Sequence, residues 1–355
     1  MKSARKKSYL LILLATIGIV VSCKKTNTNN GNDGGGNSGC SVVEMKPYVW
    51  TNPSRFPLAN IPSDNQFTEE RIALGKQLYY DARLSNNGES CNSCHKQNMG
   101  FAGDSVSTFD NGLSKPPLVN LAWYNIFMWT GRLQGTLEDV MFAEITKRFN
   151  TDIGKINAIQ DYRDKFCKYY GVSNITAQDL AKPLAQFMRV LTSSNSKYDK
   201  FVRGESGLTD YEMKGYDIFF SEKGDCFHCH AAVVLTDDMM HNNGIDSVYA
   251  KDIDKGYYNV THSEYDLGKF KTPNLRNVAL RTEFMHDGRF KTLMDVVNFY
   301  DHGVHIGVPS IDPIMTKPAK LNGGLHLTDE EKAQLIAFLN TFTDTTMTNN
   351  PFFKQ

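Results

Sequence analysis

The sequence predicts an all-α fold made of two related domains, residues 46–200 and 201–345. Apolar and aromatic residues recur at helical spacing in both parts of the chain. Several segments of the first part return in the same order in the second part, which is the signature of an internal repeat. No stretch alternates apolar and polar residues as a half-buried β-strand would. Together these observations favour helices in both domains.

The composition limits the classes of function. A chain of 355 residues with 41% hydrophobic residues can fill the cores of two domains. Its 39 Lys and Arg residues balance its 39 Asp and Glu residues. Because the chain has no excess of basic residues to bind phosphates, we expect no nucleic-acid partner.

Residues 1–22 predict an export signal. A basic start precedes an uncharged run at 9–21, which is too short for a stable membrane anchor and fits a signal peptide. The run ends in Val-Val-Ser-Cys at 20–23, which resembles a bacterial lipobox. That resemblance implies cleavage before Cys23 and attachment of lipid to its thiol. An ordinary signal peptide with an incidental cysteine is the alternative.

Residues 23–45 predict a flexible tether, because positions 24–39 are rich in Asn, Gly and Ser and hold no large apolar side chain. Such a segment cannot bury enough apolar surface to order itself. We therefore expect a protein of the periplasm that a lipid anchors to a bacterial membrane.

Each domain is expected to begin with a helix that carries a glycine and ends in aromatic residues. The first helix is predicted at residues 70–81 around Gly75, and the second at 208–222 around Gly215. The pattern Thr-x-x-Glu at 209–212 is typical of a capping box and marks the start of the second helix.

The repeat continues after these helices. Residues 127–140 (FMWTGRLQGTLEDV) align with 284–296 (FMHDGRFKTLMDV) once one residue is inserted. Each domain then ends in a further predicted helix, at 175–191 and at 327–342. We therefore interpret the chain as two copies of one helical domain.

The pattern Cys-x-x-Cys-His follows the first helix of each domain. A thioredoxin-like redox pair would need a βαβ context, and a zinc knuckle would need four compactly spaced ligands; the sequence offers neither. The pattern does supply two thiols for the vinyl groups of a haem and an imidazole for its iron. We therefore expect two covalent c-type haems. Cys91 and Cys94 would hold haem 1 with His95 as iron ligand, and Cys226, Cys229 and His230 would do the same for haem 2.

One further histidine, His228, is not expected to bind haem iron, and two further cysteines, Cys40 and Cys167, are not expected to form a disulfide. We expect His228, inside the second motif, to point to solvent or to the haem edge. Export permits a disulfide between Cys40 and Cys167, but the sequence gives no sign that they lie close together. Chance or packing is the explanation we prefer for both cysteines.

Beyond the haem motifs, the chain resembles the bacterial di-haem cytochrome c peroxidase family, which includes the MauG-type enzymes, over about residues 50–342. The resemblance is carried by the stretches 74–85 (LGKQLYYDARLS), 118–132 (LVNLAWYNIFMWTGR), 195–205 (NSKYDKFVRGE), 268–277 (GKFKTPNLRN) and 284–293 (FMHDGRFKTL). It implies two cytochrome-c-like haem domains whose haems face each other across the domain interface. It also implies that haem 1 reacts with hydrogen peroxide while haem 2 accepts electrons from a donor protein.

Trp129 falls where the family keeps a tryptophan between the two haems. The resemblance implies that its indole carries electrons from haem 2 to haem 1. A tryptophan of the hydrophobic core is the alternative.

The chain departs from the family on the peroxide side. Many members carry a histidine that caps haem 1 until reduction, but no histidine occurs between His95 and His228, so we expect an open sixth position. The family's distal Gln and Glu are also missing, and Val140 stands at the Gln position. The repeat offers Glu144 instead, because it corresponds to Tyr300 of the second domain. A solvent-facing glutamate is the alternative.

The family also binds calcium between its domains. The side-chain ligand there is an Asn, and Ser114 stands at that position in this chain. The other ligands are backbone carbonyls, here near Arg281 and Glu283, which any residue provides. The resemblance therefore gives only weak support for a bound calcium ion.

In the family, the sixth ligand of haem 2 lies fourteen residues after the histidine of a His-x-Gly motif and is Met or Tyr. Counting from His286 reaches Tyr300, the residue type of the MauG-type members. A core tyrosine bonded through its hydroxyl is the alternative role. The other candidate ligands nearby are Met285, Met294, His302 and His305.

The leading hypothesis is a peroxidase that reduces hydrogen peroxide to water. A small periplasmic protein would donate electrons, which pass from haem 2 through Trp129 to haem 1, and Glu144 would move protons. One rival is a MauG-like oxidase acting on a partner protein, and another is a non-catalytic di-haem electron carrier. An open haem 1 argues against the carrier. Family members often dimerise, but the sequence shows no local signal of it, so a homodimer is left open.

Overall fold

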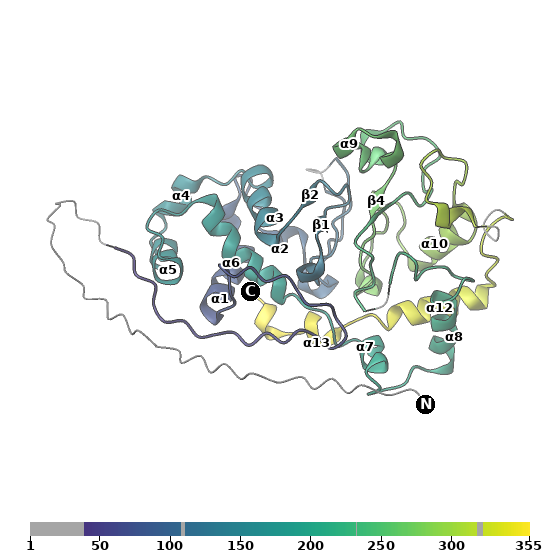
Figure 1. The fold of residues 1–355 in the computed structure, drawn as a ribbon, viewed down its shortest axis with the longest axis horizontal. Coiled ribbons are helices and arrows are strands. Elements are labelled where there is room, and N and C mark those ends of the chain that lie inside the picture. The colour runs from purple at the N-terminus through teal and green to yellow at the C-terminus, as the bar shows by residue number, and fades with distance from the viewer. Residues whose placement is uncertain (1–38, 108–110, 232, 318–321) are drawn as a thin grey trace, which may run out of the picture. The chain divides into compact units, whose positions relative to one another are not determined.

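The computed structural model describes residues 39–107, 111–231, 233–317 and 322–355. The predicted signal peptide and most of the predicted tether lie outside the described residues. The described chain is mostly helical, as predicted (Figure 1). None of its helices is long and apolar enough to cross a lipid bilayer.

The helices fall in two parts of the chain, each of which contains one haem motif. The first part contains α1 (Glu69–Tyr80), α2 (Cys91–Cys94), α3 (Leu137–Ala143), α4 (Ile153–Ala158), α5 (Gln160–Tyr170) and α6 (Ala177–Val190). The second part contains α7 (Lys197–Val202), α8 (Asp210–Phe219), α9 (Tyr258–Thr261), α10 (Leu293–Asn298), α12 (Asp329–Asn340) and α13 (Thr345–Thr348).

Capping residues set where several of these helices begin. The predicted capping box at Thr209 is confirmed at the start of α8, and Thr328 forms another at the start of α12. Thr136 and Thr292 do the same for α3 and α10, the two helices that enter the candidate site. In each case the threonine side chain accepts from the backbone N–H three residues on, which satisfies one otherwise unpaired donor.

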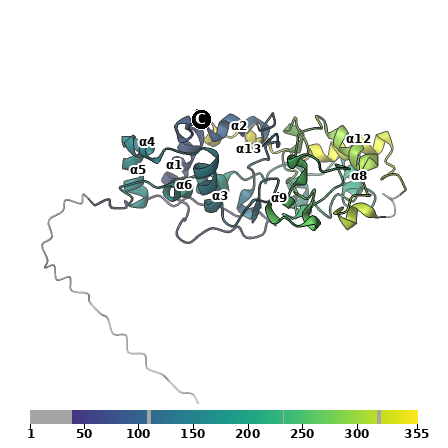
Figure 2. The same cartoon turned by 90° about the horizontal axis from the view of Figure 1, so that it is seen from above.

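Each part has its own hydrophobic core. The first core includes Tyr79 and Phe187, from α1 and α6, and the second includes Phe219 and Phe338, from α8 and α12. The pair α8 and α12 lies side by side in both Figure 1 and Figure 2. Residues after α12 return to the first core, where Met347 of α13 is buried.

Helix α1 crosses α6 at a glycine, and α8 crosses α12 at another glycine. A Cβ atom at Gly75 of α1 would lie 1.9 Å from the carbonyl oxygen of Pro183 in α6. A Cβ atom at Gly215 of α8 would lie 2.0 Å from the carbonyl oxygen of Gln334 in α12. Because neither distance leaves room for a side chain, only glycine permits each helix to approach its neighbour this closely.

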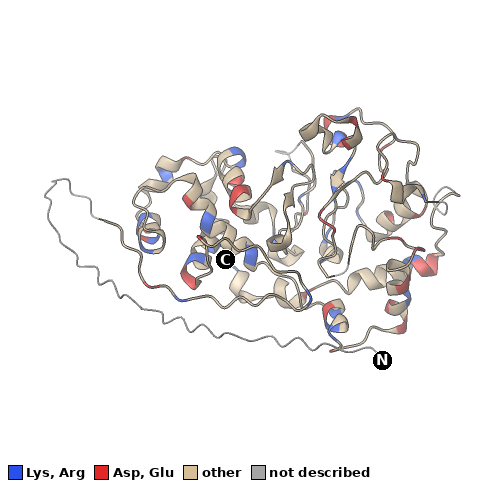
Figure 3. Cartoon of the chain, in the orientation of Figure 1, with Lys and Arg blue, Asp and Glu red and all other residues tan. Residues whose placement is uncertain are grey.

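Two small antiparallel sheets were not predicted. Strand β1 (Ile126–Phe127) pairs with β2 (Leu133–Gln134), and β3 (Met240–His241) pairs with β4 (Phe270–Lys271). Each strand has only two residues, which is too short for an alternating pattern to be visible in the sequence. Figure 3 shows Lys and Arg interspersed with Asp and Glu over the described helices.

Cys40 and Cys167 form a disulfide, so our expectation that chance or packing explains them was wrong. The bond joins the start of the described chain to α5, where the backbone N–H of Val43 also donates to the carbonyl oxygen of Lys168. The two cysteines are 127 residues apart, and sequence at that separation carries no information on proximity.

Replacing Cys167 with Ser is expected to lower the free energy of unfolding by about 2–4 kcal/mol, because the bond constrains a long loop of the unfolded chain. Urea unfolding of the haem-loaded protein measures the change. The matched control is the parent protein under a thiol reductant, which should lose the same stability, while Cys167→Ser should not respond to the reductant. Equal stability of variant and parent would contradict the prediction.

Candidate active site

The first haem motif forms a single helical turn. Ser90 caps the turn α2, and His95 ends it, with the backbone N–H of His95 bonded to the carbonyl oxygen of Cys91 at 2.9 Å. Nδ1 of His95 lies 3.1 Å from the carbonyl oxygen of Phe101. Because a carbonyl oxygen can only accept, Nδ1 carries the proton and Nε2 is left with a lone pair for a metal.

The second haem motif repeats this arrangement. The backbone N–H of His230 is bonded to the carbonyl oxygen of Cys226 at 2.9 Å, and Nδ1 lies 3.2 Å from the carbonyl oxygen of Leu235. Burial lowers the pKa of both His95 and His230 to about 4, so each imidazole is neutral at pH 7. A neutral imidazole with a fixed tautomer is the form that binds iron.

A largely apolar cavity adjoins each motif. Cys91, Cys94 and His95 line the first cavity, and Cys226, Cys229 and His230 line the second. None of these four cysteines forms a disulfide, so their sulfur atoms can form thioether bonds. Two thiols, one neutral imidazole and an apolar wall at each site fit a covalent c-type haem.

Trp129 lies in the wall that the two cavities share. Its indole Nε1 donates to the carbonyl oxygen of Ser114 at 2.9 Å. Its own carbonyl oxygen accepts from the backbone N–H of Lys271 at 2.9 Å, and Lys271 also lines both cavities. The tryptophan is therefore held at both ends between the two predicted haems.

Glu144 lines the first cavity together with Val140. It begins a π-helical turn, Glu144–Arg148, that continues α3, and Nε of Arg148 lies 3.8 Å from its carboxylate. Burial first, and then the nearby charge of Glu144, raise the pKa of the Cys91 thiol to about 12. The structure thus brings Glu144 into the same cavity as the first haem motif.

Tyr300 lines the second cavity from the equivalent place. It lies in the π-helical turn Phe299–Gly303 that continues α10. Its hydroxyl accepts from Nδ2 of Asn243 at 3.1 Å, and burial raises its pKa to about 12. A phenolate here therefore needs a positive charge beside it.

The other candidate ligands divide into two groups. Met285 also lines the second cavity. Met294 is exposed, and His302 and His305 are exposed beyond the start of the π-helical turn. Tyr300 and Met285 are therefore the predicted candidates that the structure brings to the cavity with His230.

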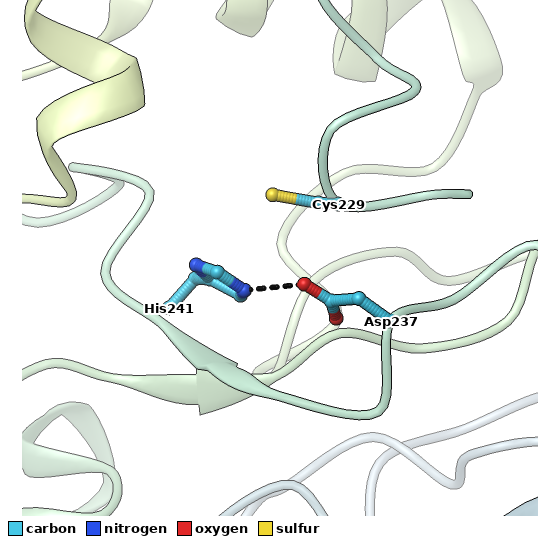
Figure 4. Close-up of side chains that lie close together, drawn as sticks. All are labelled: Cys229, Asp237 and His241. Carbon is cyan, nitrogen blue, oxygen red and sulfur yellow. Dashed lines mark hydrogen bonds and ion pairs between the residues drawn. The ribbon is translucent and has the colours of Figure 1, made fainter. Parts of the chain in front are cut away.

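His241 is a site residue that the sequence analysis missed. Figure 4 shows it beside Asp237 and Cys229, and their ligand atoms all lie within 4.8 Å of one another. Its Nε2 lies 2.7 Å from Asp237, and its Nδ1 lies 2.5 Å from Asp312. Burial opposes the charged ring, but these two carboxylates outweigh it and raise the pKa to about 9.

This cluster is not assigned to a metal. A thioether bond to haem would occupy the Cys229 sulfur, and both His241 nitrogens already face carboxylates. His241 and Asp312 line the second cavity, so the cluster is a charged part of its wall. Asp237 and His241 are only four residues apart in the sequence, but Asp312 joins them across 71 residues, which no sequence spacing could have indicated.

His228 is not among the residues that line the second cavity. Its Nε2 lies 3.0 Å from Asp225 and 3.2 Å from Glu222.

Ser114, at the family's calcium position, donates from its hydroxyl to the carbonyl oxygen of Met285 at 2.7 Å.

Comparison with known proteins places the chain among di-haem peroxidases. The sequence model described as di-haem cytochrome c peroxidase matches residues 69–207. The methylamine utilization protein MauG of Methylophilus methylotrophus is 30% identical over 294 residues, which cover 79% of this chain and 84% of that protein. Cytochrome-c peroxidase IdrP1 of Pseudomonas sp. (strain SCT) is 27% identical, with 96% and 93% covered.

Solved structures show the same fold. The crystal structure of a MauG-like protein associated with microbial copper homeostasis is 30% identical, with a TM-score of 0.78, and the match covers 86% of this chain and 99% of that one. The diheme peroxidase BthA from Burkholderia thailandensis has a TM-score of 0.65 at 19% identity, with 87% and 97% covered.

Proposed function

This chain belongs to the di-haem cytochrome c peroxidase family, and from that premise we propose that it is an exported peroxidase. It reduces hydrogen peroxide to water with electrons from a small periplasmic donor protein. The observation that carries the proposal is the pair of cavities. Each is lined by the two cysteines and the last histidine of a Cys-x-x-Cys-His motif, and Trp129 lies in their common wall. The haems, when bound, supply the redox chemistry.

The chain's own residues hold the haems and move protons. Cys91 and Cys94 attach the first haem, and His95 offers Nε2 to its iron. Glu144 accepts a proton from hydrogen peroxide and returns it to the leaving oxygen. The net reaction consumes one peroxide, two electrons and two protons and yields two water molecules. Support for this role comes from the position of Glu144 in the first cavity.

Trp129 is proposed as the path for electrons between the two cavities. Its ring lies in the shared wall, and hydrogen bonds at its indole and its carbonyl oxygen restrict its movement. An aromatic ring in this position shortens each step that an electron must make from haem 2 to haem 1.

The internal repeat is proposed as the origin of both sites. The two glycine crossings and the two π-helical turns support it. Backbone angles agree as well, since corresponding residues adopt the uncommon positive φ. These are Asn120 (63°) with Asn277 (58°), and Met128 (64°) with Met285 (67°).

We also propose that lipid on Cys23 anchors the protein in the periplasm. That cysteine lies outside the described residues. The disulfide Cys40–Cys167 supports export, because disulfides persist in oxidising compartments and are rare in the cytoplasm.

A second candidate function is a MauG-like oxidase that acts on a partner protein. The presence of Tyr300 in the second cavity favours it. A phenolate ligand stabilises ferric iron, whereas a methionine ligand raises the reduction potential. A Tyr300-bound haem 2 would therefore be a poor acceptor from a high-potential cytochrome c.

Stopped-flow mixing of the reduced two-haem protein with hydrogen peroxide tests these functions. The peroxidase should be oxidised rapidly and should then turn over with reduced cytochrome c. Rapid oxidation without cytochrome turnover would favour the MauG-like oxidase. No reaction with peroxide would contradict both and favour an electron carrier. Intact mass spectrometry beforehand should show two covalent haems on the mature chain.

A further inference from the structure

One guanidinium in the wall of the second cavity, that of the half-buried Arg281, has no acidic partner among the described residues. Arg281 follows the 3-10 turn Val278–Leu280 and lines this cavity. Its Nη2 donates to the carbonyl oxygens of Asn274 at 2.6 Å and Arg276 at 3.3 Å. Its Nε is buried and makes no hydrogen bond within the described chain. Two carbonyl oxygens therefore satisfy only part of this cation.

Other buried basic side chains of the described chain are neutralised by carboxylates. The pairs are Arg189 with Glu138 (2.6 Å), Arg276 with Asp199 (2.8 Å), Lys271 with Asp238 (2.9 Å) and Lys332 with Asp301 (2.8 Å). Arg281 forms no such ion pair among the described residues. Glu283, two residues further on, bonds Lys291 instead, at 2.8 Å.

An unpaired charge at this depth is costly. Burial lowers the pKa of Arg281 to about 10, which reflects how poorly the site hydrates the cation. Leaving a buried charge without its partner is strongly destabilising. An anion in the cavity would remove that cost, and a carboxylate would suit the guanidinium because it can accept two parallel hydrogen bonds.

We propose that Arg281 binds a propionate carboxylate of haem 2. Propionates are the anionic groups of a haem, and Arg281 lines the second cavity but not the first. The inference rests on the proposed haem in that cavity, but it does not depend on peroxide chemistry. Arg281 is a positioning residue: it fixes one edge of haem 2 and places a positive charge beside it.

The test is the reduction potential of haem 2, measured by spectroelectrochemical titration at pH 8, where the propionates are ionised. Arg281→Gln removes a positive charge that favours ferrous over ferric iron. The ratio of ferric to ferrous haem 2 at the parent's midpoint should rise at least tenfold, which is 59 mV for one electron. Arg281→Lys keeps the charge and should restore most of the shift.

Three controls separate this result from other causes. Lys214→Gln removes the same charge from an exposed position of α8 and should leave the potential of haem 2 unchanged. The potential of haem 1 should move less than that of haem 2 in Arg281→Gln. Intact mass spectrometry reports whether both haems are attached, independently of any activity.

Each outcome decides the matter. A shift in Arg281→Gln no larger than that in Lys214→Gln would overturn the proposal. If Arg281→Gln does not assemble with two haems, resonance Raman spectra of Arg281→Lys decide instead, because an unchanged propionate bending band of haem 2 would overturn it. A single haem on the parent would refute the haem assignment as well as this inference.

Discussion

Replacing Glu144 with Gln is expected to slow the reaction of the reduced protein with hydrogen peroxide by about 10²–10⁴-fold, the usual contribution of general acid–base catalysis. The substitution keeps the size of the side chain that lines the first cavity and removes its negative charge, and with it the capacity to accept a proton. Binding of the haem should not change, because Cys91, Cys94 and His95 remain in place.

Stopped-flow absorbance measures the rate, and mass spectrometry verifies two haems in the variant. Glu144→Asp keeps a carboxylate on a shorter side chain and should fall between the parent and the Gln variant. The matched control is Glu69→Gln on the surface of α1, where loss of an exposed ion pair with Lys46 should have little effect. Parent-like kinetics in Glu144→Gln would remove Glu144 from the mechanism.

Replacing Tyr300 with Phe is expected to open the sixth position of haem 2. The variant loses one hydroxyl from the cavity wall, and Nδ2 of Asn243 loses one of its two acceptors. The ferric low-spin signal of haem 2 in electron paramagnetic resonance should be replaced by a high-spin signal. Burial raises the pKa of the Tyr300 phenol, so only a bound cation makes its anionic form favourable at neutral pH.

Tyr216→Phe is the control, because it makes the same chemical change in α8 of the same part, away from the cavity lining. Its spectrum should match that of the parent. A parent-like low-spin signal in Tyr300→Phe would eliminate Tyr300 as the ligand and leave Met285 as the remaining candidate in the cavity wall.

Much of the candidate site could be predicted from residues that lie close together in the sequence. The haem motifs are contiguous in sequence, and the helix starts follow from capping residues within four positions of each other. Glu144 was placed by comparing the two halves of the chain, and Trp129 by the resemblance to the family. Glu144 lines the first cavity, and Trp129 lines both. Their roles stay predictions until the experiments above are done.

Contacts between distant segments could not be predicted. Asp312 meets His241 across 71 residues, and Cys40 meets Cys167 across 127. The same holds for Arg281, because only the fold reveals that no carboxylate among the described residues pairs with it. Single residues of these types are common in any sequence, and only tertiary packing distinguishes them.

The two π-helical turns have a consequence for how this protein tolerates insertions and deletions. A π-turn holds one residue more than the α-helical turn it replaces. Deleting one residue from 144–148 or from 299–303 would let the backbone return to the ordinary helical ladder, so the helix itself would survive. The residues that follow would rotate by about 100° relative to the cavity. Chain length at these two places therefore sets how the residues after Glu144 and Tyr300, Arg148 among them, face the cavities. Relatives with a gap there should keep the fold and lose that arrangement.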